Sequence, residues 1–330
     1  MATKKIKTVI IGLGRIAHGY EFDAMALFGM KYATHLSALA HHKGFELVAG
    51  SDISEDSRSS FNVAAKKYKL EITVYSDWEK MVTETKPDLV VVATNTDSHA
   101  KICNKLIDMG IKNILCEKPV AGTLAEAEML VAKADKNGCN LFVNYFRAFN
   151  PSYIELVDKI KSGFLGKIQT FDVKYTRGLL NNGTHFIDLL MRMFGEVSTV
   201  SGFRTPTAED FGKDPTLSAR IQFKNGVSGV IYGMNNNFYN ILELDILGEL
   251  GRVRIVNERA ELYLPHMHNT VAGYTSLKLQ PNKGLTSIKD GLYPVYDSIY
   301  NKKNRCSGLD SLNSLRVADK IVKSFNKYEK

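Results

Sequence analysis

Two glycines near the amino end have the spacing of a phosphate-binding turn. Gly12 and Gly14 directly follow the apolar run Lys7–Ile11, and Ala17 completes a Gly-x-Gly-x-x-Ala pattern. The first glycine permits a tight turn, the second lets the backbone approach a pyrophosphate, and the small third residue allows a helix to pack closely on the strand. The pattern predicts a dinucleotide-binding turn that opens a helix, whose free amides hold the diphosphate. A plain tight turn between strand and helix is the alternative.

Asp52 is the second residue for which we predict a cofactor contact. It follows the strand Glu46–Gly50, and its carboxylate could accept hydrogen bonds from an adenosine ribose. A carboxylate there would repel a 2′-phosphate, so the sequence favours NAD over NADP, with Arg58 as the residue that could reverse this preference. The alternative is a carboxylate that caps a turn or a helix. Asp52 lies further from Gly14 than the usual ~20 residues; the excess is in Gly19–Tyr32, which we predict to be an inserted loop or lengthened helix near the cofactor.

Lys118 stands at the end of a short predicted strand, within Glu117-Lys118-Pro119. Ligands bind at the carboxyl ends of parallel strands, where a lysine can hydrogen-bond both a ribose hydroxyl and the substrate oxygen that is oxidised. Its ammonium group would stabilise a developing alkoxide. Glu117 could accept a ribose hydroxyl or hold Lys118 in its charged form. An exposed lysine before a turn proline is the alternative.

His185 is the candidate proton acceptor. It lies at the start of the predicted helix Thr184–Phe194, three residues before Asp188, so the two side chains lie on neighbouring positions of one face. We expect Asn181 or Asn182 to cap this helix. The positive end of a helix disfavours an imidazolium, so we predict a neutral His185 that can take a proton from a hydroxyl group. A histidine packed in the core is the alternative.

The first 145 residues alternate between strands and helices, as a parallel sheet requires. Helical patterns such as Ser98–Met109 and Leu124–Asn137 separate short runs rich in Val, Ile and Leu, which is typical of strands buried on both faces. The predicted strands are Lys7–Ile11, Glu46–Gly50, Leu89–Ala93, Ile114–Cys116 and Leu141–Asn144. This alternation predicts βαβ units and a doubly wound sheet.

After Pro151 the pattern changes to consecutive strands. One helix, Ser152–Ser162, precedes strands with two-residue alternation, and Lys224-Asn225-Gly226 has the composition of a hairpin turn. The predicted strands are Ile168–Arg177, Ser218–Phe223, Val227–Met234, Ile241–Leu247 and Arg252–Val256, and an amphipathic helix over Leu309–Phe325 follows them.

The predicted fold class is therefore α/β with two domains. Residues 1–122 form an N-terminal Rossmann domain with a doubly wound parallel sheet. Residues 123–330 form a C-terminal α+β domain for substrate binding and oligomerisation, with a large, mostly antiparallel open sheet. The strand Leu141–Asn144 and the final helix could pack back on the first domain.

The composition is that of a soluble globular protein and argues against several classes. No apolar run reaches the roughly 18 residues that span a bilayer. The four cysteines, Cys103, Cys116, Cys139 and Cys306, form no Cys-x-x-Cys pair, which favours a reducing, cytoplasmic compartment. The net charge is +8, but no basic block is dense enough to predict nucleic-acid binding. His41-His42 and His266-x-His268 lack acidic or cysteine partners at ligand spacing, so we expect no metal site.

Together with several further motifs, these residues resemble the Gfo/Idh/MocA oxidoreductases (glucose–fructose oxidoreductase, inositol dehydrogenase and relatives). The further motifs are Thr94–His99 after a strand, Asn144–Pro151, Asn181–Asp188 and the glycine turn Gly248–Gly251. The resemblance covers nearly the whole chain, and Glu-Lys-Pro at the end of a Rossmann strand is its most specific element. It implies a cis peptide at Lys118–Pro119. The expected cofactor contacts are Gly12, Gly14, Arg15, Ile16, Asp52, Thr94, Asn95, Thr96, His99, Glu117 and Lys118.

The resemblance implies an NAD-dependent dehydrogenase that acts on CH–OH groups. It would transfer a hydride between the nicotinamide and a hydroxyl carbon of a sugar, sugar acid or nucleotide-linked sugar, with Lys118 and His185 as catalytic residues. The expected substrate contacts are Lys118, Arg147, Tyr175, Arg177, Asn181, Thr184 and His185. For Arg147, Tyr175 and Arg177, surface or interdomain salt bridges are the alternative.

One departure from the family pattern bears on the mechanism. Many sugar-alcohol members have an aspartate four residues before the histidine, where this chain has Asn181. An amide cannot take a proton, which argues against a Lys–Asp–His relay; His185 would act alone or through water, with Asn181 binding a substrate hydroxyl. The Asn-Asn-Gly-Thr-His form is similar to members from surface-polysaccharide biosynthesis and favours a nucleotide-linked sugar.

Two other functions are compatible with the resemblance. A family member can use bound NAD for transient oxidation in an epimerase, dehydratase or glycosidase reaction. A non-catalytic NAD-binding regulator is the other alternative, and the presence of both Lys118 and His185 argues against it. The family often pairs subunits through the open face of the second sheet, so a homodimer or homotetramer is expected.

Overall fold

The computed structural model describes residues 4–22, 30–256, 258–267, 273–281 and 290–328. Its contacts divide the chain into two compact units, Met1–Asn150 with Lys289–Leu312 and Pro151–Ile288 with Asn313–Lys330. The residues from 123 to 150 therefore lie with the first unit. The functional boundary that the sequence places after residue 122 stays a prediction.

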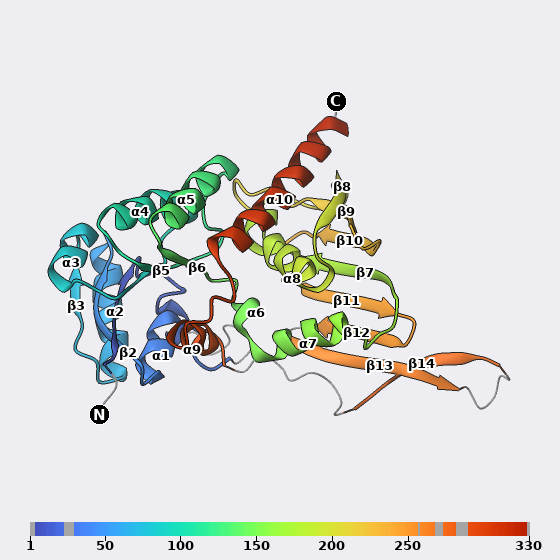
Figure 1. Cartoon of the computed structure of the whole chain (residues 1–330), viewed down its shortest axis with the longest axis horizontal. Coiled ribbons are helices and arrows are strands. Elements are labelled where there is room, and N and C mark those ends of the chain that lie inside the picture. Colours follow the sequence, from blue (N-terminus) through green and yellow to red (C-terminus); the bar gives the residue numbers. More distant parts are fainter. Residues whose placement is uncertain (1–3, 23–29, 257, 268–272, 282–289, 329–330) are drawn as a thin grey trace. The chain divides into compact units, whose positions relative to one another are not determined.

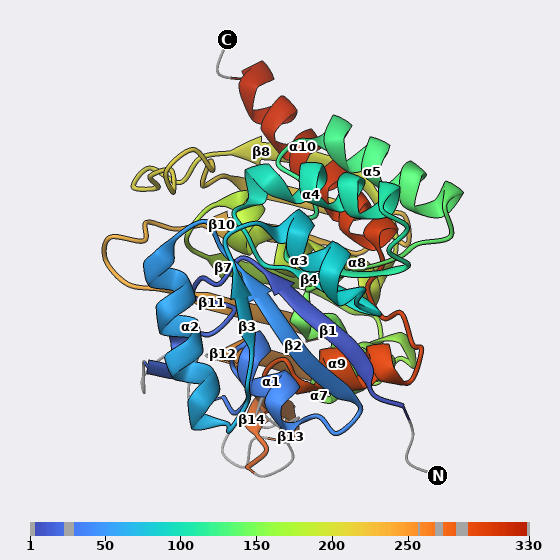
Figure 2. The same cartoon turned by 90° about the vertical axis from the view of Figure 1, so that its left-hand side faces the viewer.

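The first unit is built on a six-stranded parallel sheet in the order β3-β2-β1-β4-β5-β6. This is the strand order of a dinucleotide-binding Rossmann fold, and it confirms the predicted doubly wound sheet. Figure 2 shows β1, β2 and β3 side by side. The strands are β1 (Ile6–Ile11), β2 (Phe45–Ser51), β3 (Thr73–Tyr75), β4 (Leu89–Val92), β5 (Asn113–Cys116) and β6 (Asn140–Val143).

The helices of the first unit begin at clear capping residues. Thr34 forms a capping box with Ser37 at the start of α1, and Thr123 forms one with Glu126 at the start of α5. Asp77 caps α3. The helices are α1 (His35–His41), α2 (Glu55–Lys67), α3 (Trp78–Thr85), α4 (Thr96–Asp108), α5 (Leu124–Lys136), α6 (Phe146–Phe149) and α9 (Tyr293–Tyr300).

The segment after the glycine turn differs from the expected helix. Gly14 to Ala17 forms turns, and a short 3₁₀ helix, η1 (Gly19–Phe22), follows them. The first α-helix starts only at His35. Of the predicted insertion Gly19–Tyr32, residues 23–29 lie outside the described part of the chain.

The second unit contains an eight-stranded sheet in the order β14-β13-β12-β11-β7-β10-β9-β8. The pair β7–β10 is parallel and the other neighbours are antiparallel, which confirms the predicted mostly antiparallel sheet. The strands are β7 (Ile168–Tyr175), β8 (Val197–Phe203), β9 (Ser218–Phe223), β10 (Ser228–Gly233), β11 (Leu242–Gly248), β12 (Gly251–Val256), β13 (Arg259–Met267) and β14 (Thr275–Leu279).

Two helices, α7 (Pro151–Lys161) and α8 (Thr184–Phe194), lie along one side of this sheet (Figure 1). Phe194 of α8 packs on Phe171 of β7 and Phe223 of β9, with ring centroids 5.7 and 5.4 Å apart. Aromatic burial of this kind supplies much of the apolar area that fixes a helix on a sheet. The last helix, α10 (Gly308–Tyr328), begins in the first unit and continues in the second. Among the described residues, no helix is long and apolar enough to cross a membrane.

Candidate active site

The glycine turn at the end of β1 has two glycines with different surroundings. Gly12 has a φ of +89°, and a Cβ atom there would lie 2.7 Å from the carbonyl group of Ala93 and the nitrogen of Thr94. A side chain at this position would therefore clash with main-chain atoms at the end of β4. Gly14 is exposed, and an added Cβ would meet no described atom within 4 Å. The turn is thus tightly packed on the protein side and open on the side where a pyrophosphate could approach.

Substituting each glycine by alanine should separate stability from cofactor binding. We expect Gly12→Ala to lower the free energy of unfolding by about 3 kcal/mol, because it combines a left-handed backbone with overpacking against main chain. Gly14→Ala should change stability by less than about 0.5 kcal/mol, as is usual for an exposed site, yet weaken NADH binding at least tenfold. Urea denaturation and NADH fluorescence titration measure the two effects. Equal losses of stability in Gly12→Ala and Gly14→Ala would contradict the assignment of Gly12 to main-chain packing and of Gly14 to cofactor binding.

Asp52 connects the glycine turn to the end of β2. Its Oδ2 atom accepts a hydrogen bond from the N–H group of Leu13 at 2.8 Å, and its Oδ1 atom accepts one from that of Ser54 at 2.9 Å. The guanidinium group of Arg58 donates to the carbonyl oxygens of Asp52 and Ile53. The carboxylate therefore caps the turn, which was the alternative interpretation. It remains partly exposed, and its contact with a ribose stays a prediction.

The residues predicted after β4 fall into an exposed and a buried group. Asn95 is exposed, and Thr94 and Thr96 are partly exposed, at the start of α4. His99 is 0% exposed, and its ring nitrogens lie 2.8 Å from the Pro119 carbonyl oxygen and 3.0 Å from that of Thr94. His99 thus links the segment after β5 to the end of β4, so it would support the cofactor site through these two loops.

Glu117 and Lys118 follow β5 directly, and the Lys118–Pro119 peptide is cis, which confirms the expectation from the family resemblance. Glu117 is 8% exposed, and its Oε1 atom lies 3.0 Å from Nε2 of His35 and 2.6 Å from Nδ2 of Asn144. Its Oε2 atom lies 3.4 Å from the N–H group of Lys118. Lys118 itself is partly exposed.

The surroundings of Glu117 keep its carboxyl group ionised. Burial alone would raise the pKa of Glu117. The hydrogen bond from His35 and its charge, the hydrogen bond from Asn144 and the charge of Lys118 together outweigh burial, so the pKa lies below its usual value. Oε1 already has two partners and is a poor acceptor for a ribose hydroxyl, whereas Oε2 has one long contact. The two roles considered for Glu117, accepting a ribose hydroxyl and favouring the charged form of Lys118, both stay predictions.

The predicted capping of the His185 helix is wrong. A π-helical turn, Leu179–Gly183, runs directly into α8, so His185 does not lie in the first helical turn of this segment. The side chains of Asn181 and Asn182 donate backwards to the carbonyl oxygens of Arg177 and Thr176. The expected helix-terminus effect on the charge of His185 is therefore lost, because that effect falls off within the first turn.

Asp214 is the capping residue that sequence reasoning missed. Its carboxylate accepts hydrogen bonds from the N–H groups of Leu180 and Asn181 at 2.9 and 2.8 Å. It comes from a loop more than 30 residues further along the chain, and no local pattern connects it to this helix start. Its negative charge offsets the positive end of the helix.

Within α8, His185 and Asp188 are both buried, at 7% and 4% exposed. Asp188 forms a bidentate ion pair with Arg192, with nitrogen–oxygen distances of 2.7 and 3.0 Å. Thr184 donates its hydroxyl hydrogen to the carbonyl oxygen of Leu180, so it stabilises the junction of the π turn and the α-helix. His185 thus lies buried on a helix whose start is held by side-chain hydrogen bonds.

The three further substrate-binding candidates have different environments. Tyr175 is 0% exposed, and its hydroxyl donates to the carbonyl oxygen of Leu217; burial raises its pKa well above the ordinary value. Arg177 is exposed, has a φ of +67° and lies 5.3 Å from the ring centre of Phe211. Arg147 is 3% exposed on α6. Of these three, Arg177 has the exposure that a substrate contact requires, and Tyr175 has a structural hydrogen bond.

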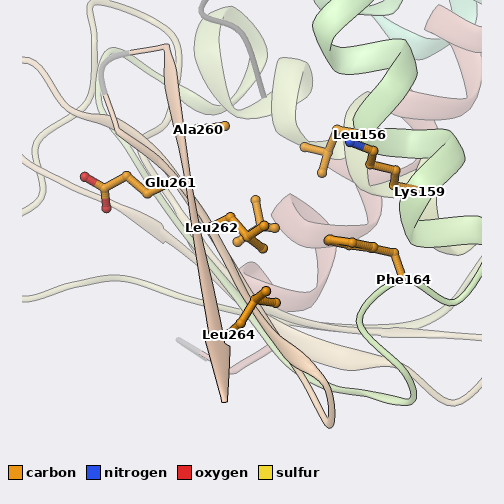
Figure 3. A pocket seen from close by; sticks show the side chains of 8 residues that line it. Leu156, Lys159, Phe164, Ala260, Glu261, Leu262 and Leu264 are labelled. Atoms are coloured by element: carbon orange, nitrogen blue, oxygen red, sulfur yellow. The ribbon is translucent and has the colours of Figure 1, made fainter. Parts of the chain in front are cut away.

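An apolar pocket of about 280 Å³ lies elsewhere in the second unit. Figure 3 shows Leu156 and Lys159 of α7 opposite Leu262 and Leu264 of β13, with Phe164 at one side and the Glu261 carboxylate pointing away. Its lining includes none of the residues predicted from the sequence. Because it lacks convergent polar groups, we do not assign the chemistry to it.

The histidine pairs give no metal site among the described residues. The structure places no three His, Cys, Asp or Glu side chains close enough to hold an ion there. His41 bonds to the carbonyl oxygen of Ser37, one turn back in its own helix, and His266 is exposed on β13. His268 lies outside the described residues.

The strand order and the open glycine turn at the carboxyl edge of the sheet define a dinucleotide-binding protein of the Rossmann class, with an additional α+β unit. The chain belongs to the Gfo/Idh/MocA family. The family model described as "Oxidoreductase family, NAD-binding Rossmann fold" matches residues 6–145, and that of the "GFO/IDH/MocA C-terminal domain" matches residues 176–254.

Curated relatives are about one-quarter identical to this chain over the residues that align. Inositol 2-dehydrogenase of Salmonella typhimurium is 26% identical over 182 residues, which are 54% of this chain and 47% of that protein. The match thus spans about half the length of that relative. The uncharacterized oxidoreductase YrbE of Bacillus subtilis is 26% identical over 342 residues, covering 96% of this chain and 93% of that protein.

Among solved structures, the WlbA dehydrogenase from Bordetella pertussis, in complex with NADH and UDP-GlcNAcA, has the same fold. The TM-score is 0.76 at 21% identity, and the alignment covers 99% of this chain and 97% of that one.

Proposed function

We propose that this protein is an NAD-dependent dehydrogenase that oxidises a hydroxyl group of a sugar-type substrate. The observation that carries the proposal is the lysine at the carboxyl end of β5, next to a buried, ionised glutamate and in the same unit as an open glycine turn. Ligands of open α/β sheets bind at this edge. NAD, when bound, would supply the hydride acceptor.

Lys118 would bind and polarise the oxygen of the substrate. Its ammonium group is kept charged by Glu117 and can donate hydrogen bonds to a hydroxyl group that becomes negative during oxidation. His185, the second residue of α8, would accept the hydroxyl proton. The main chain of Gly12 to Ile16 would hold the diphosphate, with Asp52 and the start of α4 on the ribose side.

The relatives support two substrate classes. Some are named for inositol, and the WlbA structure contains UDP-GlcNAcA. We favour a nucleotide-linked sugar because exposed Arg177, beside the Phe211 ring, could pair with a phosphate, and because the chain has a net charge of +8. In this proposal the enzyme is cytoplasmic and forms a homodimer or homotetramer.

A screen for bound nucleotide and turnover tests the proposal. Mass spectrometry of the purified protein should detect NAD or NADP. An excess of NAD would support the expected preference set by Asp52, and an excess of NADP would show that Arg58 reverses it. Incubation with NAD and a panel containing UDP-GlcNAcA and myo-inositol should produce NADH with one of the two classes. Product formation without NADH would support transient oxidation in an epimerase, dehydratase or glycosidase. Nucleotide binding with no conversion of any panel member would favour a regulator.

A further inference from the structure

Three elements of the first unit converge on the carboxylate of Glu117. His35 comes from the first turn of α1, Tyr296 from α9, and Asn144 from the residue after β6. The Tyr296 hydroxyl lies 2.7 Å from Nδ1 of His35, and Nε2 of His35 lies 3.0 Å from Oε1 of Glu117. His35 and Tyr296 are both 0% exposed. A polar chain therefore runs through the core to the residue before Lys118.

The direction of one bond in this chain follows from the charge of Glu117. An ionised carboxylate can only accept, so Nε2 of His35 carries the hydrogen that His35 donates to Oε1 of Glu117. Burial is the largest cause that raises the pKa of Tyr296 well above its ordinary value, and the charge of Glu117 adds to it, so the Tyr296 hydroxyl keeps its proton. This hydroxyl can donate to Nδ1 of His35 or accept from it, and in either case it orients the ring.

The start of α1 holds the ring of His35 in place. Thr34 and Ser37 form a capping box that is itself buried, with Thr34 at 0% and Ser37 at 4% exposed. The Tyr296 ring also packs on the His35 ring edge to face, with centroids 5.9 Å apart. A buried cap fixes the backbone from which His35 projects, so its imidazole has a single orientation toward Glu117.

We propose that His35 is a positioning residue for Lys118: oriented by Tyr296, it holds the Glu117 carboxylate in place and thereby keeps the neighbouring lysine charged and correctly directed. This inference rests on the proposed function, in which Lys118 contacts the substrate oxygen. No part of it requires His35 to touch the substrate or the cofactor.

In the described part of the first unit, the titratable and polar groups known to act on Glu117 come from several elements. They are His35 of α1, Tyr296 of α9, the Asn144 amide, and the adjacent Cys116 and Lys118. Burial raises the pKa of Cys116 well above its usual value, so this thiol stays neutral. Removing His35 would therefore leave burial as the strongest influence on Glu117, and its pKa would rise.

A substrate-free experiment uses ¹⁵N-histidine and ¹³C-glutamate NMR on the full chain. In the wild type we expect a hydrogen on Nε2 of His35 and an ionised Glu117 throughout the neutral range, with signals assigned from their loss in His35→Gln and Glu117→Gln. His35→Leu should move the Glu117 titration upward by at least one pH unit. His35→Gln, which can still donate from Nε2, should restore most of the shift. A His35 ring without a hydrogen on Nε2, or an unmoved Glu117 titration in His35→Leu, would overturn the proposal.

Kinetics on the fastest panel substrate test the effect on Lys118. We expect His35→Leu to lower kcat about 10- to 100-fold, as for the loss of a hydrogen bond to a charged group, with the acid limb of the pH profile moved upward and KM for NAD within threefold. His35→Gln should recover at least half of the loss in log kcat, and Tyr296→Phe should lower kcat less than His35→Leu does. The matched control is His41→Leu. His41 lies in the same helix as His35, and the one described hydrogen bond of its side chain is to the carbonyl oxygen of Ser37.

The outcomes separate this inference from the proposed function. Full turnover in a Lys118 variant would contradict the proposed function, whereas the NMR result on His35 and Glu117 stands independently of turnover. An inactive Lys118 variant together with a fully active, stably folded His35→Leu would contradict the positioning role alone. If His35→Leu does not fold, His35→Gln and Tyr296→Phe test the positioning role instead. Their kcat values and pH profiles must then shift as stated.

Discussion

Replacing Lys118 by methionine is expected to lower kcat by about 10²- to 10³-fold, the usual effect of removing one group that stabilises a developing oxyanion. Methionine keeps most of the length and apolar volume of the side chain but cannot donate a hydrogen bond or carry charge. Since Lys118 is partly exposed at the end of β5, the fold should tolerate the change. Steady-state kinetics with NAD and the panel substrate measure the effect.

The matched control is Lys112→Met. Lys112 is exposed just before β5, at the opposite end of the same strand from Lys118, and its ammonium group donates to the Asn137 carbonyl oxygen. We expect the kcat of Lys112→Met to equal that of the wild type. The NADH affinity of both Lys112→Met and Lys118→Met should stay within threefold of the wild-type value. A Lys118→Met enzyme that retains more than half of the wild-type kcat would rule out the proposed role of the lysine.

Replacing His185 by glutamine is expected to lower kcat by about 10²- to 10⁴-fold, the range typical of lost general acid–base catalysis. Glutamine can fill the buried site and form hydrogen bonds but cannot take up a proton at neutral pH. Rates measured from acid to alkaline pH, with thermal unfolding as a check on folding, give the result.

The control for this prediction is His266→Gln in the same unit. His266 is exposed on β13, so its substitution should leave both kcat and the pH profile unchanged. A His185→Gln enzyme that retains more than half of the wild-type kcat would assign proton transfer to another residue.

The parts of the fold that the sequence predicted well have a strong local signal. The buried strands β1, β4 and β5 are short runs of Val, Ile and Leu, and their apolar character reflects burial on both faces. The helix α8 was predicted with the bounds that the structure shows, because its apolar positions repeat at helical spacing.

Four strands were missed. In β13, Ala260, Leu262 and Leu264 are spaced two residues apart, and this pattern was overlooked. The other three have weak local signals for identifiable reasons. β3 has three residues, none of them fully buried, and β14 is a mostly exposed edge strand. Neither has the alternation of apolar and polar residues that predicts a half-buried strand. β8 contains small and hydroxyl-bearing residues that also occur in loops. Pairing with neighbouring strands decided these elements.

The sequence by itself determined the residues that can do chemistry: the glycine turn, the lysine after β5 and the histidine of α8 all stand in local patterns. Only the tertiary structure decided their surroundings. His35 and Glu117 are 82 residues apart in the chain, and Tyr296 lies 261 residues from His35. Asp214, not the neighbouring asparagines, holds the start of the α8 segment. Burial and hydrogen bonding between distant segments set the charge and direction of a side chain, and no local spacing records them.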